Sequence, residues 1–206
     1  MSGTRSIRLM GRGGQGTVTA SKLLVAAAVA EGLYAQAVPS YGQERKGAPV
    51  FAYARIDHRP IWMHSFVYEA DAVVVFDLSL VSLGIDVLTG LVPGGIVVVN
   101  SPSPPEPDAL KVAPDRPLPE GLQLFWVDAT GITRAEIGPV PPNAAMLGAL
   151  AGATGWVSID TVADAIQQGM GARVGPANVR AARRAFEAVR PVGPVPARGG
   201  AGAGLP

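Results

Sequence analysis

The stretch "IRLMGRGGQGTVTASKLLVAAAVAE", residues 7–31, places an apolar run, a glycine-rich turn and a long Ala-rich segment end to end. The first four residues predict a buried strand. The segment from about Gly14 to Glu31, free of Gly and Pro after Gly16, predicts a helix. Past its start this helix carries only Lys22 and Glu31 as charges, so we expect it to be covered on more than one side.

The rest of the chain alternates further strands and helices. Continuous Val and Ile runs are typical of strands buried on both faces of a parallel sheet. Strands are expected at 7–10, 33–39, 70–77, 94–100 and 122–129, and a hairpin at 50–56 and 60–65. Helices are expected at 78–90, 143–153, 159–170 and 176–189, with Ser158 as the N-cap of the third. The fold class is therefore α/β: an open, mostly parallel sheet with a glycine-rich strand–turn–helix, a β-hairpin insertion and C-terminal helices.

Length and composition predict one domain over residues 1–190, because 206 residues suit a single core. Residues 101–121 are proline-rich and are expected to run over the surface. Residues 191–206 are nearly all Pro, Gly and Ala, which predicts a disordered tail.

Several classes of site and partner are excluded by composition. The chain has no cysteine, so it carries no disulfide, thiolate zinc site or cysteine-ligated iron–sulfur cluster. It has no apolar run of about 18 residues and no signal-peptide pattern in "MSGTRS", so a soluble, cytoplasmic protein without membrane contact is expected. A net charge of +1 and the lack of a basic stripe with interleaved aromatics argue against nucleic acid as a partner.

The glycine turn is the first candidate binding site. Gly11, Gly13 and Gly16 satisfy G-x-G-x-x-G between a predicted strand and a predicted helix, where backbone N–H groups can approach a phosphate. A nicotinamide dinucleotide also needs an acidic residue at the end of the second strand, and "AVPSY" has none there. Three interpretations stay open: a nicotinamide dinucleotide, another phosphate-bearing ligand, or a tight turn that only packs the helix on the strand.

Other candidate residues favour no catalytic or metal site. No Gly-Lys-Ser/Thr follows the turn, so a Walker-type phosphate loop is excluded. His58 and His64 flank Pro60 without a carboxylate cluster, which indicates solvated positions of the predicted hairpin rather than metal ligands. Asp77, at the end of an apolar strand, either lines a crevice at the carboxyl edge of the sheet or caps the next helix.

Four longer segments carry a more specific signal. "GRGGQGTVTASKLL", "YAQAVPSYGQERKGAPVFAYARI", "ADAVVVFD" and "PPNAAMLGALAGATGWVSIDTVADAI" closely resemble the gamma subunit of pyruvate:ferredoxin, or 2-oxoacid:acceptor, oxidoreductases. The resemblance covers about residues 5–190. "SYGQERKGAP" is similar to that family's loop S-[FY]-G-x-E-x-[RK]-G-A-P, which the related indolepyruvate oxidoreductases lack.

The resemblance implies a subunit of a multi-subunit enzyme that is not catalytic alone. Such enzymes decarboxylate a 2-oxoacid on thiamine diphosphate, send electrons through iron–sulfur clusters and pass the acyl group to coenzyme A. This chain has neither a Gly-Asp-Gly motif with a downstream Asn-Asn nor any cysteine. Thiamine diphosphate, Mg and [4Fe-4S] clusters are therefore expected on alpha, beta and cluster-bearing delta-type partners, with ferredoxin or another acceptor reached through the complex. The 2-oxoacid stays open, pyruvate and aromatic acids such as phenylglyoxylate included.

The resemblance also implies that this chain helps to bind coenzyme A and to build the active-site wall. The candidate residues are Gly11, Arg12, Gly13, Gly14, Gln15, Gly16, Ser40, Tyr41, Arg45, Lys46, Gly47 and Asn143.

Each candidate side chain has a second interpretation. Arg12 meets a phosphate or projects to solvent, Arg45 and Lys46 meet a phosphate or an acidic partner, Tyr41 stacks or packs, and Asn143 contacts ligand or caps its helix. Burial against another subunit would explain the nearly uncharged first helix. Two other functions stay open: a purely structural or assembly subunit, and a stand-alone nucleotide-binding Rossmann-like enzyme.

Overall fold

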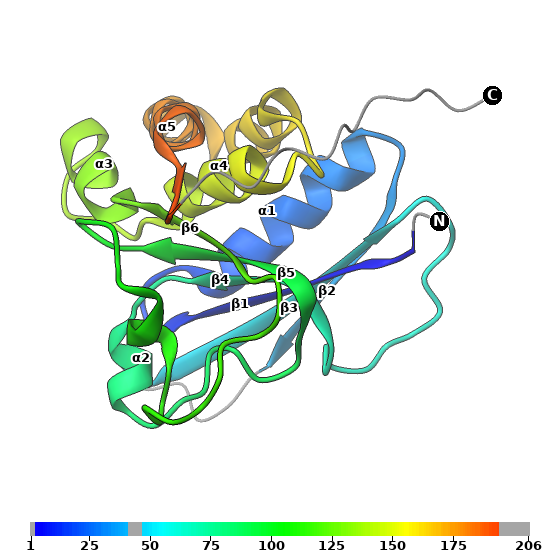
Figure 1. The fold of residues 1–206 in the computed structure, drawn as a ribbon. Helices are drawn as coiled ribbons and strands as arrows, with labels where there is room; N and C mark the ends of the chain where they lie inside the picture. Colours follow the sequence, from blue (N-terminus) through cyan, green and yellow to red (C-terminus); the bar gives the residue numbers. More distant parts are fainter. Residues whose placement is uncertain (1–2, 41–46, 194–206) are drawn as a thin grey trace.

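The fold is built on one mixed sheet, seen in a computed structural model that describes residues 3–40 and 47–193 (Figure 1). Its strands are β1 (Arg5–Arg12), β2 (Tyr34–Ser40), β3 (Pro49–Asp57), β4 (Ala70–Val75), β5 (Leu91–Asn100), β6 (Gln123–Val127) and β7 (Arg190–Pro191). Their order across the sheet is β2-β3-β1-β4-β5-β6-β7. Strands β1, β4, β5 and β6 run parallel, while β2 and β3 at one edge and β7 at the other are antiparallel to their neighbours. The predicted α/β class with a mostly parallel central sheet is confirmed.

Apolar β-branched residues form the centre of the sheet. Val73 of β4 pairs with Val97 of β5, and both side chains are fully buried. Such runs suit strands that are covered on both faces. Because the four central strands are parallel, their carboxyl ends meet at one edge of the sheet.

Helices cover one face of the sheet and mostly irregular segments cover the other (Figure 1). The helical layer consists of α1 (Thr17–Ala30), α3 (Ala129–Glu136), α4 (Asn143–Thr154) and α5 (Ile159–Ala188). On the other face lie α2 (Ser79–Ser82), the 3-10 turn η1 (Pro107–Leu110) and the segments around them. The result is two apolar cores, one on each side of the sheet.

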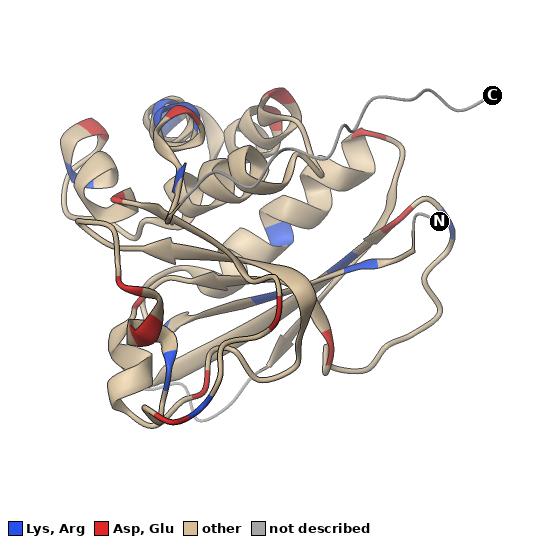
Figure 2. Cartoon of the chain, in the orientation of Figure 1, with Lys and Arg blue, Asp and Glu red and all other residues tan. Residues whose placement is uncertain are grey.

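Helix α1 lies between the sheet and the other helices, as its lack of charge predicts. It contacts β1, β2 and β3 on one side and α4 and α5 on another. Lys22 is the one charged residue of α1, and Figure 2 shows the helix mostly in tan. Packing within this chain accounts for the low charge, for which the sequence had suggested burial against another subunit.

The pair α4 and α5 is held close by small residues. A Cβ on Gly148 would overlap the backbone carbonyl of Ala182, so only glycine allows this approach. Within α5, Gly171 has a φ of 76° and a non-helical ψ of 176°, which breaks the element where two separate helices were expected. Ser158 is confirmed as an N-cap, because its side chain accepts a hydrogen bond from Thr161 N at 3.1 Å.

The predicted second hairpin strand at 60–65 is wrong. Both edges of β3 are already paired, one with β1 and one with β2, so no ladder is left for it. Pro60 also lacks a donor. The hairpin of this sheet is β2–β3 instead, and residues 58–69 form a loop on the sheet's surface.

Three other parts of the structure differ from the prediction. The helix expected at 78–90 shortens to α2, because Gly84 adopts a left-handed φ of 77° and the Asp86 carboxylate accepts from Leu88 N in a turn. Helix α3, which the sequence did not predict, follows β6. Its N-cap is Asp128, whose carboxylate accepts a hydrogen bond from Gly131 N at 2.7 Å. Pro191, where the disordered tail was expected to begin, pairs with β6 in β7. Residues 194–206 lie outside the described residues.

No helix in the described part of the chain is both long and apolar enough to cross a bilayer.

Candidate functional site

The glycine turn lies at the sheet edge where the parallel strands end. There a hollow of about 320 Å³ opens between the ends of β4 and β5 and the start of α3. It is lined by Gln15, Phe76, Asp77, Leu78, Ser79, Asn100, Ser101, Pro102 and Thr130. Open α/β sheets bind ligands at this edge. Asp77 lines the hollow, as one of its two interpretations predicts, and its carboxylate accepts from Ser79 N at 2.9 Å. The N-cap position of α2 is occupied by Leu78.

Backbone hydrogen bonds fix the turn from two sides. Gly13 N donates to Ala48 O at 2.8 Å, and Gly47 N donates to Gly13 O at 3.2 Å. Inside the turn, Gln15 N donates to Arg12 O at 3.0 Å. The predicted residue Gly47 is therefore joined directly to the glycine turn, although 34 positions separate it from Gly13 in the sequence.

Two predicted ligand side chains are used inside the turn itself. Gln15 Oε1 accepts from Arg12 N at 2.7 Å, and Gln15 Nε2 donates to Asp77 Oδ2 at 3.0 Å. The Arg12 guanidinium donates to Ser79 Oγ at 2.6 and 2.9 Å and to Gly47 O at 3.2 Å, and it lies 3.3 Å from Asp77 Oδ2. Arg12 therefore braces the turn and does not project freely to solvent.

Asp77 is kept ionised by this network. Burial raises the pKa of its carboxyl, but hydrogen bonds from Ser79 and Gln15 and the nearby Arg12 charge outweigh burial, so the pKa lies below its usual range. The charge of Arg12 is thus balanced inside the protein, which leaves backbone N–H groups as the donors for an anion.

Gly16 brings two helix N-termini together. It precedes α1 with a left-handed φ of 77°, and a Cβ there would lie 2.7 Å from Asn143 Nδ2, the first residue of α4. Neither helix has a side-chain hydrogen bond at its N-cap or an acidic residue in its first turn. Asn143 is 7% exposed, and its Oδ1 accepts from Ala144 N at 2.9 Å. Two positive dipole ends therefore meet at this point, where an anion is stabilised.

Thr17 is a candidate residue beside the turn that sequence reasoning missed. Its hydroxyl is buried and has no hydrogen-bond partner among the described residues. A Cβ added to Gly11 would lie only 2.5 Å from this hydroxyl oxygen. A buried hydroxyl without a partner is costly, so it marks a position with spare hydrogen-bonding capacity. The signal available in the sequence was a threonine directly after the third glycine.

Of the remaining predicted residues, three lie in the described part of the chain and three lie outside it. Gly11 is the next-to-last residue of β1, opposite Val50, and Ser40 ends β2 opposite Phe51, so both lie at the same end of the sheet. Gly14 sits at the tip of the turn with a φ of 98° and open space around it. The predicted positions Tyr41, Arg45 and Lys46 lie outside the described residues.

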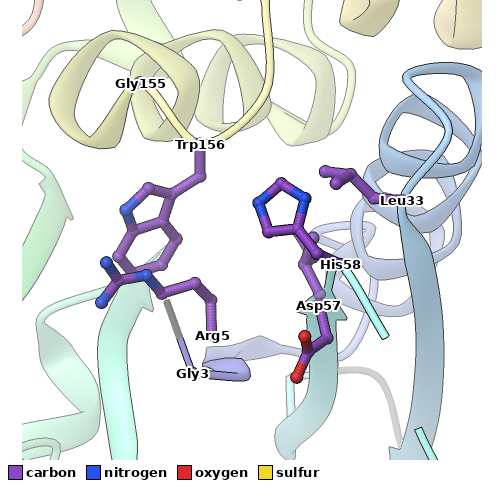
Figure 3. A pocket seen from close by; sticks show the side chains of 8 residues that line it. Gly3, Arg5, Leu33, Asp57, His58, Gly155 and Trp156 are labelled. Carbon is purple, nitrogen blue, oxygen red and sulfur yellow. The ribbon is translucent and has the colours of Figure 1, made fainter. Parts of the chain in front are cut away.

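A second hollow of about 240 Å³ lies near the start of β1 and the end of β3, far along the strands from the glycine turn (Figure 3). Figure 3 shows the Trp156 indole beside the Arg5 side chain, with His58 and Leu33 across from them. Arg5 is held by the Trp156 ring, 5.2 Å from its centroid, and by Asp71 at 3.8 Å. Its charge is therefore already paired, and within the described residues no group of three or more His, Asp or Glu is placed to hold a metal ion.

Comparison with known proteins identifies the family. The model of the family described as pyruvate ferredoxin/flavodoxin oxidoreductase matches residues 6–188. The "Pyruvate/ketoisovalerate oxidoreductases common subunit gamma" of Thermococcus kodakarensis is 46% identical over 182 residues, which cover 87% of this chain and 94% of the relative.

Solved structures agree with this match. The pyruvate oxidoreductase subunit PORC of Thermotoga maritima superposes with a TM-score of 0.76 at 35% identity, covering 92% of this chain and 98% of that one. The 2-oxoglutarate:ferredoxin oxidoreductase of Magnetococcus marinus, solved with 2-oxoglutarate, coenzyme A and succinyl-CoA bound, has a TM-score of 0.72 at 19% identity. This chain covers 31% of that protein, and the likeness shows the shared fold alone. The chain belongs to the pyruvate ferredoxin/flavodoxin oxidoreductase family, as a gamma-type subunit of an oxidoreductase.

Proposed function

We propose that this chain holds a phosphate group of coenzyme A at the glycine turn of a thiamine diphosphate-dependent 2-oxoacid:ferredoxin-type oxidoreductase, and there forms part of the active-site wall. The complex would convert a 2-oxoacid and coenzyme A to CO₂ and an acyl-CoA, with two electrons passed to ferredoxin or another acceptor. In this proposal thiamine diphosphate and Mg belong to partner subunits because this chain has no Gly-Asp-Gly motif with a downstream Asn-Asn, and the [4Fe-4S] clusters do because it has no cysteine. These partners are alpha, beta and delta-type subunits.

The observation that carries the proposal is the meeting of α1 and α4 at Gly16 and Asn143. The first-turn N–H groups of both helices point toward the carboxyl edge of the sheet, and a helix leaves these groups without intrahelical partners. Asn143 Nδ2 adds a side-chain donor at the same place. Coenzyme A carries several phosphate charges, which such a cluster of donors would bind.

The Arg12 and Gln15 contacts support the alternative of an assembly subunit without a ligand. Their side chains stabilise the turn from inside, which a purely structural turn would also need. The two functions differ in whether the first turns of α1 and α4 contact coenzyme A.

Amide hydrogen exchange on the assembled complex tests the proposal. We expect coenzyme A to slow exchange at residues 14–18 and 143–146, and pantetheine, which lacks phosphate, to leave these amides unchanged. Residues 158–161, at the start of α5, serve as the internal control because Ser158 and Glu31 already cap them. Equal exchange with and without coenzyme A in an active complex would favour the assembly function.

A substitution gives a second readout. Asn143→Ala removes the donor beside Gly16, so KM for coenzyme A should rise several-fold while KM for the 2-oxoacid stays unchanged. The matched control is Asn178→Ala, because Asn178 is similarly buried but donates to Val174 O within α5 at 2.9 Å.

A further inference from the structure

The loop between β3 and β4 displays large apolar side chains that the protein itself leaves in water. Trp62 is 85% exposed, Tyr68 74% and Met63 60%, with Phe66 at 44%. Tyr34, at the start of the edge strand β2, is 49% exposed. We call these five side chains the apolar patch.

The loop is held in place and does not collapse onto the sheet. Arg55 of β3 is 4% exposed, and its guanidinium donates to Ser65 O at 2.7 Å and Phe66 O at 3.0 Å. The Phe66 ring packs on Tyr53, with centroids 5.2 Å apart. Burying a guanidinium to fix two loop carbonyls is costly, so the loop conformation is strongly specified.

The same contacts place the loop across the open edge of the sheet. Arg55 holds residues 65 and 66 over β3, and the Gln36 side chain of β2 donates to Met63 O. Passing from residue 66 back to 63, the loop therefore crosses from β3 to β2. Trp62 and Met63 thus lie at the outer edge, where β2 has no further strand among the described residues.

The middle of the loop and the edge strand carry no charged residue. Residues 60–68 and the whole of β2 contain no Asp, Glu, Lys or Arg, and Figure 2 shows the loop in tan between its ends. Soluble proteins protect open sheet edges with charged residues, and large exposed apolar patches mark interaction sites. Within the described chain β2 has no edge charge, and what lies against it is the apolar loop that Gln36 holds at Met63 O.

We infer that the apolar patch and the open edge of β2 bind another subunit of the oxidoreductase, through an apolar and uncharged surface of that subunit. The inference rests on the proposed function for the presence of such a subunit. Four aromatic side chains that are 44% to 85% exposed and a methionine that is 60% exposed offer roughly 400 Å² of apolar surface. That is about half of what each partner contributes to a standard interface, so the patch forms the centre of one. Because the patch is apolar and uncharged, we expect a permanent partner, since the interfaces of obligate complexes are as apolar as the core of a domain.

The test compares two double variants in the co-expressed complex. Trp62→Ser with Met63→Ser removes the centre of the patch, and Leu83→Ser with Val140→Ser removes exposed apolar side chains elsewhere, at 54% and 44% exposure. Native mass measured across a dilution series gives the concentration at which the complex dissociates. Buried aromatic residues at an interface centre are often hot spots, so the patch variant should dissociate at a concentration at least about tenfold higher. The control should match the wild type.

A second measurement guards against misfolding. Thermal unfolding of the patch variant should match the wild-type chain, because both replaced side chains are mostly in solvent. Amides of β2 and of residues 61–66 should exchange more slowly in the wild-type complex than in the free chain.

Each other outcome overturns a defined statement. A patch variant that dissociates at the wild-type concentration overturns the inference alone. A free chain that dimerises, and loses only dimerisation in the patch variant, assigns the patch to a second copy and also overturns it. A wild-type chain that recruits no other subunit overturns the proposed function, and the inference with it.

Discussion

Replacing Gly16 by alanine tests the close approach on which the site is built. The residue sits at a left-handed φ of 77°, and an added Cβ would lie 2.7 Å from Asn143 Nδ2 and 2.9 Å from Asn143 Cβ. Gly14, two positions earlier, also has a positive φ, of 98°, but nothing lies within 4 Å of its added Cβ. Gly14→Ala is therefore a control for backbone strain without the close contact.

The magnitude follows from separating these two costs. A left-handed conformation costs an alanine about 1–2 kcal/mol, and both variants carry this cost. Overpacking against Asn143 adds about 1–3 kcal/mol in Gly16→Ala alone. The excess of about 2 kcal/mol corresponds to a Tm about 4–8 °C below that of Gly14→Ala for a chain of this size.

Calorimetry of the two variants and of Asn143→Gly measures this excess. In the Asn143→Gly background the whole Asn143 side chain, its Cβ included, is gone, so Gly16→Ala should cost no more than Gly14→Ala costs in the wild type. Equal Tm values for the two single glycine variants would refute the reasoning, because the contact of α1 with α4 would then carry no weight. An excess that persists without Asn143 would refute it too.

Two further predictions concern ionised side chains. Glu31 accepts from Ser158 N and Thr161 Oγ1, both at 2.6 Å, so Glu31→Gln should lower the free energy of unfolding in urea by about 0.5–1 kcal/mol, a value reduced by solvent screening. A similar urea midpoint for both proteins would contradict this. Asp77 has a lowered pKa in the folded state, so its contribution is present above the unfolded pKa of about 3.9 and is lost as pH falls through the folded value. Asp77→Asn should therefore weaken the loss of stability below about pH 4, measured by urea unfolding at several pH values, and an unchanged pH profile would exclude this contribution.

The central strands and helices were predictable from the sequence because their apolar composition agrees with their burial in the folded chain. The Val runs of β4 and β5 and the Ala-rich α1 are buried, as their composition indicates. The strand predicted at 60–65 is absent because a segment forms a strand only where a neighbouring strand has a free edge to pair with. Ile61 to Ser65 have a strand-like composition, yet β3 had no free edge for them.

The candidate site was predictable only in part. The glycine spacing marked the turn, and the family loop marked Gly47, which bonds to Gly13. The roles of side chains were not visible, because Arg12 could be expected to meet either phosphate or solvent. The structure shows a third role, with the guanidinium held by Ser79 and Asp77.

By itself the sequence determined the α/β class, the buried parallel strands, the position of the glycine turn and the family, since each depends on residues that are neighbours in the chain or on a continuous match. The tertiary structure decided which distant groups meet. Asn143 reaches Gly16 because α4 packs on α5 and α1, and Arg55 fixes the apolar loop because β3 lies beneath it. Such contacts depend on helix packing and strand order, and no local pattern in the sequence encodes them.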